Sequence, residues 1–151
     1  MYPIAQLAEV ANRLQNEPGT RVVILCGPGE EALARELAGK MRTPPVSTAD
    51  DILPLDVTKG VLQRCAVIIT TDTGPRHIAI AVGTPAVVIM GPTDPRYTDS
   101  HLGATIVLRR DVPCGPCGLK VCPIDHVCMR SIPPEEVVEA AEHLMASTPA
   151  S

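Results

Sequence analysis

The length, composition and charge of this chain already exclude several classes of protein. It has 151 residues, of which 45% are hydrophobic and 20% charged, and a formal net charge of −4, as expected for one globular domain. It has no basic tract, and its only aromatic residues are Tyr2 and Tyr97, so it lacks the charge and stacking surfaces of a nucleic-acid binder. Its longest apolar stretch, residues 78–90, is too short and interrupted to span a bilayer. We therefore predict a chain that binds no nucleic acid and has no transmembrane segment.

The cysteines and the start of the sequence bear on the compartment. The opening residues are neither basic nor followed by a long apolar core, so we recognise no signal peptide. Without an export signal, the six cysteines are expected to be reduced. These features predict a cytoplasmic location.

Segments typical of helices and strands alternate along the chain. Helical spacing of apolar residues predicts five helices, with Thr58 as the N-cap of the third: residues 4–14, 30–41, 58–64, 76–82 and 134–145. Apolar runs predict five strands: residues 21–26, 46–48, 66–70, 86–90 and 105–109. Such alternation predicts an α/β fold, a doubly wound parallel sheet with helices on both faces.

The remaining segments complete the expected domain. Residues 49–57 are expected to form a loop, and residues 78–82 a wholly buried part of their helix. The domain would span residues 1–146 and include a Cys- and Pro-rich loop over residues 112–129. Residues 147–151 would be a disordered tail.

The most informative segment is residues 71–77, Thr-Asp-Thr-Gly-Pro-Arg-His, which joins a predicted strand to a predicted helix. Such a turn lies at the carboxyl edge of a parallel sheet, where ligands bind in open α/β folds. Pro75 suits the first helical position, and the N–H groups that follow it have no partner within the helix. Arg76 and His77 place positive charge in the first turn, where it opposes the helix dipole unless an anion binds. The turn therefore predicts a phosphate site.

Each residue of this turn has a candidate role. Asp72 can accept hydrogen bonds from sugar hydroxyls, Thr73 offers a hydroxyl and an amide, and Gly74 lets a ligand approach the backbone. Arg76 and His77 can donate to phosphate oxygens. The alternative is a structural turn, in which Asp72 or Thr73 only caps the helix and His77 is satisfied locally.

A second polar turn, Gly91-Pro92-Thr93-Asp94-Pro95, follows the next predicted strand and lies at the same edge. Two adjacent turns at that edge form a crevice, so Gly91 and Thr93 are also candidate ligand contacts. The alternative is a Pro-rich turn in which Thr93 and Asp94 serve only the backbone.

The segment Gly27-Pro28-Gly29-Glu30-Glu31-Ala32 matches the dinucleotide fingerprint G-x-G-x-x-A, and Asp50 and Asp51 lie near the distance expected for a ribose-binding acid. We reject this interpretation, because Glu30 and Glu31 stand in the first helical turn. There they satisfy the helix dipole themselves and would repel a pyrophosphate. We expect a tight structural turn stabilised by its own acids.

Four cysteines and a histidine gather in the loop over residues 112–129: Cys114, Cys117, Cys122, His126 and Cys128. Thiolates and imidazole suit tetrahedral zinc, so a structural zinc site is one prediction. The spacing lacks the second C-x-x-C of a common zinc ribbon, which leaves an iron–sulfur cluster, a disulfide pair or buried thiols as alternatives. We expect Cys26 and Cys65 in the core and His101 and His143 at the surface.

In combination, these motifs resemble those of the glycosyltransferase family 9 heptosyltransferases, over nearly the whole chain. The matching segments are Asp72-Thr73-Gly74-Pro75-Arg76-His77-Ile78-Ala79, Gly83-Thr84-Pro85, Gly91-Pro92-Thr93-Asp94-Pro95, Gly27-Pro28-Gly29-Glu30-Glu31, and the Cys loop from Cys114-Gly115-Pro116-Cys117 to Cys128-Met129. The resemblance implies a GT-B fold of two Rossmann-like domains, of which this chain would be the carboxyl-terminal, donor-binding one.

The resemblance also implies an activity. Asp72 would hold hydroxyls of the donor sugar, and Thr73, Gly74 and His77 would line the diphosphate of ADP-heptose or a similar nucleotide sugar. The heptose would pass to the lipopolysaccharide inner core with inversion and without a metal or other cofactor in the reaction. Helix-start amides and nearby cations would offset the charge on the departing ADP. The protein would be cytoplasmic or peripheral at the inner face of the inner membrane.

One departure from the family bears on activity. Tyr2-Pro3 stands where family members carry Trp-Pro after the first strand of this domain. We therefore expect that strand, the acceptor domain and the general base to lie outside these 151 residues. The chain alone would have little or no transferase activity, and its open sheet edge would invite the acceptor domain or self-association.

Two other functions remain open from the residues. One is a stand-alone nucleotide-sugar-binding or regulatory module that performs no chemistry. The other is a metal-dependent interaction module built on the Cys loop.

Overall fold

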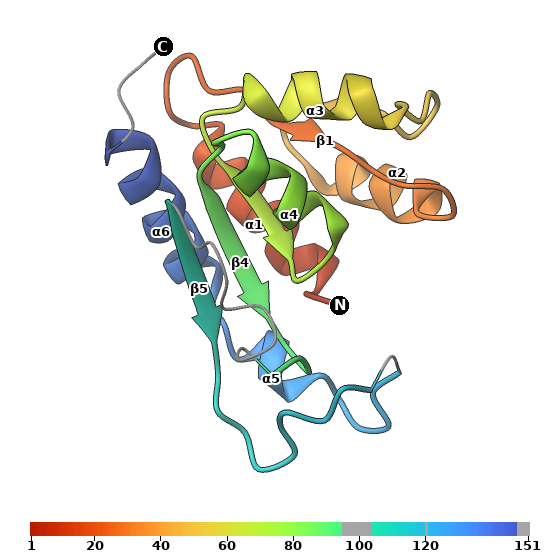
Figure 1. Cartoon of the computed structure of the whole chain (residues 1–151), viewed down its shortest axis with the longest axis vertical. Coiled ribbons are helices and arrows are strands. Elements are labelled where there is room, and N and C mark those ends of the chain that lie inside the picture. The colour runs from red at the N-terminus through yellow and green to blue at the C-terminus, as the bar shows by residue number, and fades with distance from the viewer. Residues whose placement is uncertain (95–103, 120, 148–151) are drawn as a thin grey trace. The chain divides into compact units, whose positions relative to one another are not determined.

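The structure, a computed structural model, describes residues 1–94, 104–119 and 121–147 (Figure 1). The chain forms two compact units. One runs from Pro3 to Thr58, and the other combines Met1 and Tyr2 with the chain from Lys59 onward. The second unit includes the start of the chain because the buried Tyr2 hydroxyl donates to the Ile132 carbonyl at 2.9 Å.

The Pro3–Thr58 unit contains two helices and a short two-stranded sheet: α1 (Ile4–Leu14), β1 (Val23–Ile24), α2 (Glu31–Lys40) and β2 (Val46–Ser47). Helices α1 and α2 pack against each other, and β1 pairs with β2 in parallel, Val23 opposite Val46. Each helix and strand β1 supply one residue to the buried core of this unit, which comprises Ala11, Ile24, Ala34, Met41 and Ala49. Cys26 packs against that core, as predicted.

Strand β1 is shorter than the predicted strand over residues 21–26, because the length of a strand depends on its partner. Pro44 and Pro45 precede β2 and have no N–H to donate to the ladder. Beyond β2, the Cys26 N–H donates to the Thr48 hydroxyl at 3.2 Å instead of to a backbone carbonyl. Only Val23 and Ile24 therefore remain in the strand.

Helix α3 (Leu55–Gln63) corrects the predicted loop over residues 49–57. Thr58 is not the N-cap: it lies inside the helix, and its N–H and hydroxyl both donate to the Pro54 carbonyl, at 2.9 and 3.1 Å. The signals for the earlier start are in the sequence. Pro54 has a φ suited to a helix start, and Asp56 favours the positive end of the helix dipole.

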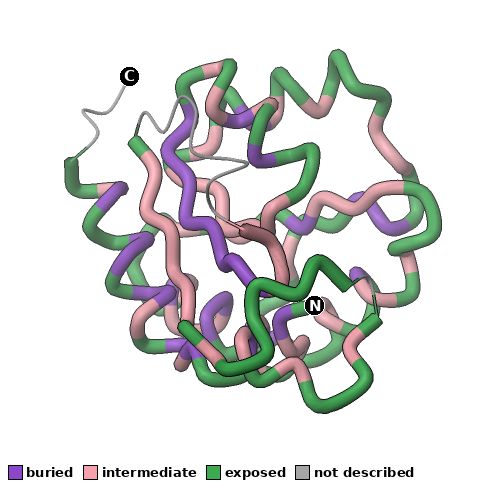
Figure 2. Tube along the Cα trace, turned by 60° about the horizontal axis from the view of Figure 1, so that its bottom comes forward, coloured by how far each residue is buried: buried purple, intermediate pink, exposed green. Residues whose placement is uncertain are grey.

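The second unit is built on a three-stranded parallel sheet in the order β3 (Ile68–Thr71), β4 (Ala86–Met90) and β5 (Thr105–Arg109). Helices α4 (Gly74–Ala81) and α6 (Pro134–Ser147) both pack against β4. Residues 84–91 are all buried and form the long purple run of Figure 2. A central strand buried on both faces confirms the predicted parallel α/β arrangement.

Two helices of this unit differ from their predictions. Helix α4 is not wholly buried, because it packs through one face: Arg76 and Ala79 are buried, whereas His77 and Ala81 are exposed. Helix α6 includes Ser147, whose hydroxyl donates to the His143 carbonyl at 2.8 Å. Ser147 is therefore not part of a tail, and residues 148–151 lie outside the described residues.

The loop after β5 contains a short helix, α5 (Val127–Arg130), which contacts β4. Across residues 1–94, 104–119 and 121–147, no helix is long and apolar enough to cross a membrane.

Candidate functional site

The two polar turns predicted at one sheet edge do lie there. Strands β3 and β4 run parallel with Thr71 opposite Ile89, so the chain leaves both strands at the same edge. Asp72 is the first residue after β3, and Gly91 is the first residue after β4. Because ligands bind outside the carboxyl ends of such strands, this edge is the candidate site.

The N-cap residue of α4 gives the start of the helix no side-chain cap. Thr73 is the N-cap residue with an extended backbone (φ −139°, ψ 176°) and makes no side-chain capping hydrogen bond. Its hydroxyl instead lies 3.4 Å from the Thr71 carbonyl, to which it donates. Gly74 takes the first helical position and Pro75 the second, one place later than predicted. The structure therefore does not support the alternative in which Thr73 only caps the helix.

The polar surface of this turn is accessible. Thr73, Gly74, Pro75 and His77 are all exposed. Pro75 has no N–H, and the Arg76 N–H donates to the Thr73 carbonyl at 3.1 Å. The Gly74 N–H is one of the donors that a helix start leaves without an intrahelical partner. An anion at this point would meet that amide and the His77 imidazole.

Asp72 and Arg76 form an ion pair that the sequence analysis missed. Nη1 of Arg76 donates to Oδ1 of Asp72 at 2.6 Å. The Arg76 side chain is 1% exposed and the Asp72 side chain is 8% exposed. The sequence predicts Arg76 as a phosphate contact, but the structure directs its guanidinium to Asp72. The spacing of four residues, which brings oppositely charged side chains together at a helix, was the available signal.

The turn after β4 is fixed by packing as well as by hydrogen bonding. Gly91 is buried, and a Cβ placed on it would lie 2.9 Å from both Cγ and Cε of Met129. The Gly118 N–H donates to the Pro92 carbonyl at 2.8 Å, which ties the Cys loop to this turn. Thr93 is half-buried. The absence of a side chain at Gly91 thus has a structural reason: it makes room for Met129.

The turn at Gly27 is occupied by its own acids, as predicted. The Gly27 N–H donates to the Glu30 carboxylate at 2.9 Å. Hydrogen bonds from the N–H groups of Glu31 and Gly29 lower the pKa of the Glu31 carboxyl. Gly29 adopts a left-handed φ of +87°, which explains a glycine at this position. The donors that a pyrophosphate would need are therefore used by the protein.

The two acids considered as ribose ligands both make contacts within the protein. Asp50 accepts a hydrogen bond from Arg35 at 2.8 Å, and Arg35 also donates to the Ala49 carbonyl at 3.1 Å. Asp51 is exposed and donates its N–H to the Thr48 carbonyl. The arrangement supports the rejection of the dinucleotide fingerprint.

The Cys loop does not support the predicted zinc site. All six cysteines are free thiols, with Cys114 and Cys117 exposed and Cys122 and Cys128 half-buried. The His126 N–H donates to the Cys122 sulfur at 3.3 Å, and His126 has a left-handed φ of 48°. Within the described ranges, no group of three or more His, Cys, Asp or Glu side chains is placed to hold a metal ion. The backbone hydrogen bond of Gly118 and the packing of Met129 hold the loop instead.

The other predicted cysteines and histidines are placed as follows. Cys65 is half-buried, its sulfur donates to the Val61 carbonyl at 3.3 Å, and burial raises the pKa of its thiol. His143 is exposed on α6, as predicted. His101 lies outside the described residues.

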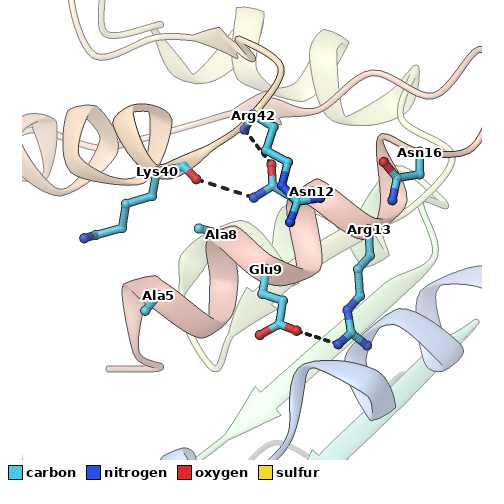
Figure 3. Close-up of a pocket in the computed structure, with 8 residues that line it drawn as sticks. All are labelled: Ala5, Ala8, Glu9, Asn12, Arg13, Asn16, Lys40 and Arg42. Atoms are coloured by element: carbon cyan, nitrogen blue, oxygen red, sulfur yellow. Dashed lines mark hydrogen bonds and ion pairs between the residues drawn. The ribbon is translucent and has the colours of Figure 1, made fainter.

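A separate pocket lies between α1 and the end of α2 (Figure 3). Its polar groups bind one another: Arg13 pairs with Glu9 at 2.5 Å, and the Asn12 side chain bonds to the backbone of Lys40 and Arg42. None of the predicted site residues lines it. The Asn12 bonds fasten α1 to the end of α2, and the Arg13–Glu9 pair lies within α1.

Comparisons with known proteins agree with the motifs. Residues 1–128 match the sequence model of glycosyltransferase family 9 (heptosyltransferase). The chain is 32% identical to lipopolysaccharide heptosyltransferase 1 of Pseudomonas aeruginosa over 124 residues, which are 80% of this chain and 33% of that protein. It is 39% identical to a lipooligosaccharide heptosyltransferase 2 of Campylobacter jejuni over 88 residues, 56% of this chain and 27% of that protein.

Solved structures show the same similarity in three dimensions. The Escherichia coli ADP-heptose LPS heptosyltransferase II superposes with a TM-score of 0.84 at 25% identity, covering 99% of this chain and 43% of that one. A family 9 glycosyl transferase from Veillonella parvula gives 0.80 at 25% identity, covering 97% and 42%. The chain thus spans about a third or less of the curated relatives described above and less than half of these solved chains.

Proposed function

This chain belongs to glycosyltransferase family 9, and we propose that it is the donor-binding part of a heptosyltransferase. In this proposal the donor is ADP-heptose and the acceptor is the inner core of lipopolysaccharide. The observation that carries the proposal is the start of α4, which is exposed, has no side-chain cap and lies at the carboxyl edge of the sheet beside Asp72. That edge offers donors for a diphosphate and an acceptor for sugar hydroxyls.

Each group at the edge has a distinct role in the proposal. The Gly74 N–H at the start of α4 and the exposed His77 imidazole bind the diphosphate, because both are donors next to the positive end of the helix dipole. The Asp72 carboxylate accepts hydrogen bonds from the sugar. Thr93 and the Gly91 backbone complete the crevice from the neighbouring turn.

The same groups favour the chemical step. Transfer of the sugar leaves additional negative charge on the departing ADP. The Gly74 amide and the His77 imidazole donate to the diphosphate and stabilise that charge as it develops, which lowers the barrier to transfer. The sequence similarity of this chain to a lipopolysaccharide heptosyltransferase supports sugar transfer as the reaction class.

We further propose that the chain needs an acceptor-binding part for activity. It spans 43% of the Escherichia coli heptosyltransferase II chain, and neither turn of the site supplies a group that we assign as general base. The acceptor-binding part would contribute the base and the lipopolysaccharide contacts. The assembled enzyme would act in the cytoplasm, at the inner face of the inner membrane.

Calorimetry tests the donor site directly. We expect the chain to bind ADP saturably and His77→Ala to weaken that binding about tenfold, the loss expected for one hydrogen bond to a charged group. The matched control is Glu30→Ala in the Gly27 turn, which should leave ADP affinity unchanged. No ADP binding, or tighter binding of NAD than of ADP, would contradict the donor site.

A transfer assay tests the need for a second part. The purified chain, mixed with ADP-heptose and a lipopolysaccharide acceptor lacking heptose, should release no ADP above background. Turnover by the chain alone would contradict the proposed need for an acceptor-binding part. It would not contradict the donor site.

A further inference from the structure

We propose that Arg76 is a positioning residue: its guanidinium holds the Asp72 carboxylate in the orientation that binds the sugar of the donor. The inference rests on the proposed function and adds a residue to it. Arg76 itself would touch neither the sugar nor the diphosphate, since its side chain is 1% exposed.

The Arg76–Asp72 pair is buried, unlike two other ion pairs of the same spacing. Arg13–Glu9 and Lys40–Glu36 have the same spacing of four residues, but all four of their side chains are at least 37% exposed. Exposed pairs of this kind contribute little to stability. The Arg76–Asp72 pair is nearly excluded from water. A charge in such a buried place is tolerated only if a partner compensates it. The position of each group therefore depends on the other.

Arg76 also stands at an electrostatically unfavourable place in its helix. It lies in the first turn of α4, where a cation opposes the helix dipole. A buried cation at that end is unfavourable for the helix, so its benefit must come from elsewhere. The short Nη1–Oδ1 contact of 2.6 Å shows that this benefit goes to Asp72, the residue that directly follows β3 and begins the turn to α4.

The chemistry of a carboxylate explains how the pair serves binding. A carboxylate has two oxygens with about four acceptor sites, and the hydrogen bond from Arg76 uses Oδ1 of Asp72. Acceptor capacity remains for sugar hydroxyls while the guanidinium fixes the plane of the group. A fixed acceptor loses less conformational entropy on binding than a mobile one, so its hydrogen bonds to the sugar contribute more affinity.

The test compares two ligands that differ only in the sugar, ADP and ADP-heptose, by calorimetry on the whole chain. For Arg76→Met we expect ADP-heptose affinity to fall about tenfold while ADP affinity changes less than twofold. A role limited to folding would lower both affinities by the same factor, through the folded fraction. Asp72→Asn should show the same selective loss.

A double-mutant cycle completes the test. If Arg76 acts through Asp72, Arg76→Met should add no further loss of sugar affinity in the Asp72→Asn background. Arg76→Lys keeps the charge but not the planar fork, and it should lose only part of the sugar affinity. Arg76→Lys also serves if Arg76→Met does not fold.

The outcomes separate the inference from the proposed function. Absence of ADP binding by the unaltered chain would remove the donor site itself. If ADP binds, two results would overturn the inference alone: ADP-heptose binding no tighter than ADP, or Arg76 variants that keep the full preference for ADP-heptose.

Discussion

Two strand-to-helix turns in this chain have similar local form and opposite electrostatics. At residues 27–31, the Glu30 carboxylate accepts the Gly27 N–H, and backbone N–H groups bind Glu31. At residues 72–77, the nearby acid, Asp72, pairs with the side chain of the buried Arg76. The first turn supplies its own anions, whereas the second leaves its start to a ligand.

The difference shows that a glycine-rich turn after a strand does not by itself identify a phosphate site. What decides is whether a carboxylate of the protein already occupies the donors at the helix start. The Gly27 turn matches the better-known fingerprint, but its donors bind its own acids, whereas the acid of the Asp72 turn binds Arg76.

The largest effect is expected from breaking the buried pair. Arg76→Met leaves the nearly buried Asp72 carboxylate without its cation, and removal of one partner of a buried pair costs about 3–5 kcal/mol of unfolding free energy. Denaturant unfolding measures the loss. The control is Lys40→Met, which breaks an exposed pair of the same spacing and should cost less than about 1 kcal/mol. Equal losses in the two variants would mean that burial does not distinguish the pairs.

A smaller effect is expected at the neighbouring turn of the same sheet edge. Gly91→Ala places a Cβ 2.9 Å from Met129 Cγ and Cε, and overpacking of this kind costs about 1–3 kcal/mol. The control is Gly39→Ala in helix α2, where the new Cβ meets no atom within 4 Å. Because alanine favours a helix more than glycine does, the unfolding free energy of this variant should rise by up to about 1 kcal/mol. Thermal unfolding of both variants gives the sign of each change. A neutral Gly91→Ala would show that Met129 moves freely.

Removal of an acid from the first turn should have a modest effect. Glu30→Ala deletes the acceptor of the Gly27 N–H, and we expect a loss of about 1 kcal/mol in urea unfolding. The control is Glu142→Ala on the exposed surface of α6, which should change stability by less than about 0.5 kcal/mol. A loss no greater than that of the control would mean that the Glu30 hydrogen bond does not stabilise the turn.

The smallest effect is a pH dependence of the first turn. Hydrogen bonds from backbone N–H groups lower the pKa of Glu31 below 4.5. The folded chain therefore binds a proton less readily than the unfolded chain, and the stabilisation is present above pH 4.5 and lost as pH falls through the folded pKa. An NMR titration should show Glu31 titrating below that value, and Glu31→Gln should lose less stability on acidification. A Glu31 pKa at or above 4.5 would contradict the contact.

Segments with one clear apolar pattern were predictable from the sequence. Helix 4–14 and strands 86–90 and 105–109 have the predicted bounds. Their patterns are bounded by residues that break regular structure, such as Pro85 before β4 and Gly91 after it. The two turns at the sheet edge followed from the parallel order of the strands.

Segments whose form depends on a partner were not predictable in the same way. The strand over residues 21–26 shrinks to Val23–Ile24, because ladder hydrogen bonds require a partner strand of equal length. The spacing of the Cys loop is compatible with several kinds of site, because the positions of its thiols depend on how the loop folds; among the described residues, no group of three or more metal-binding side chains forms. Helix α3 is a different case, since Pro54 and Asp56 already signalled its start.

The sequence by itself determined the α/β class, the family motifs and the charge contrast between the two turns, because these depend on residue type and short-range spacing. Only the tertiary structure decided what the charged side chains of the second turn bind. Arg76 is a cation in any conformation, but packing of α4 on β3 and β4 buries it. Burial then makes Asp72 its counterion, because a charge excluded from water requires one.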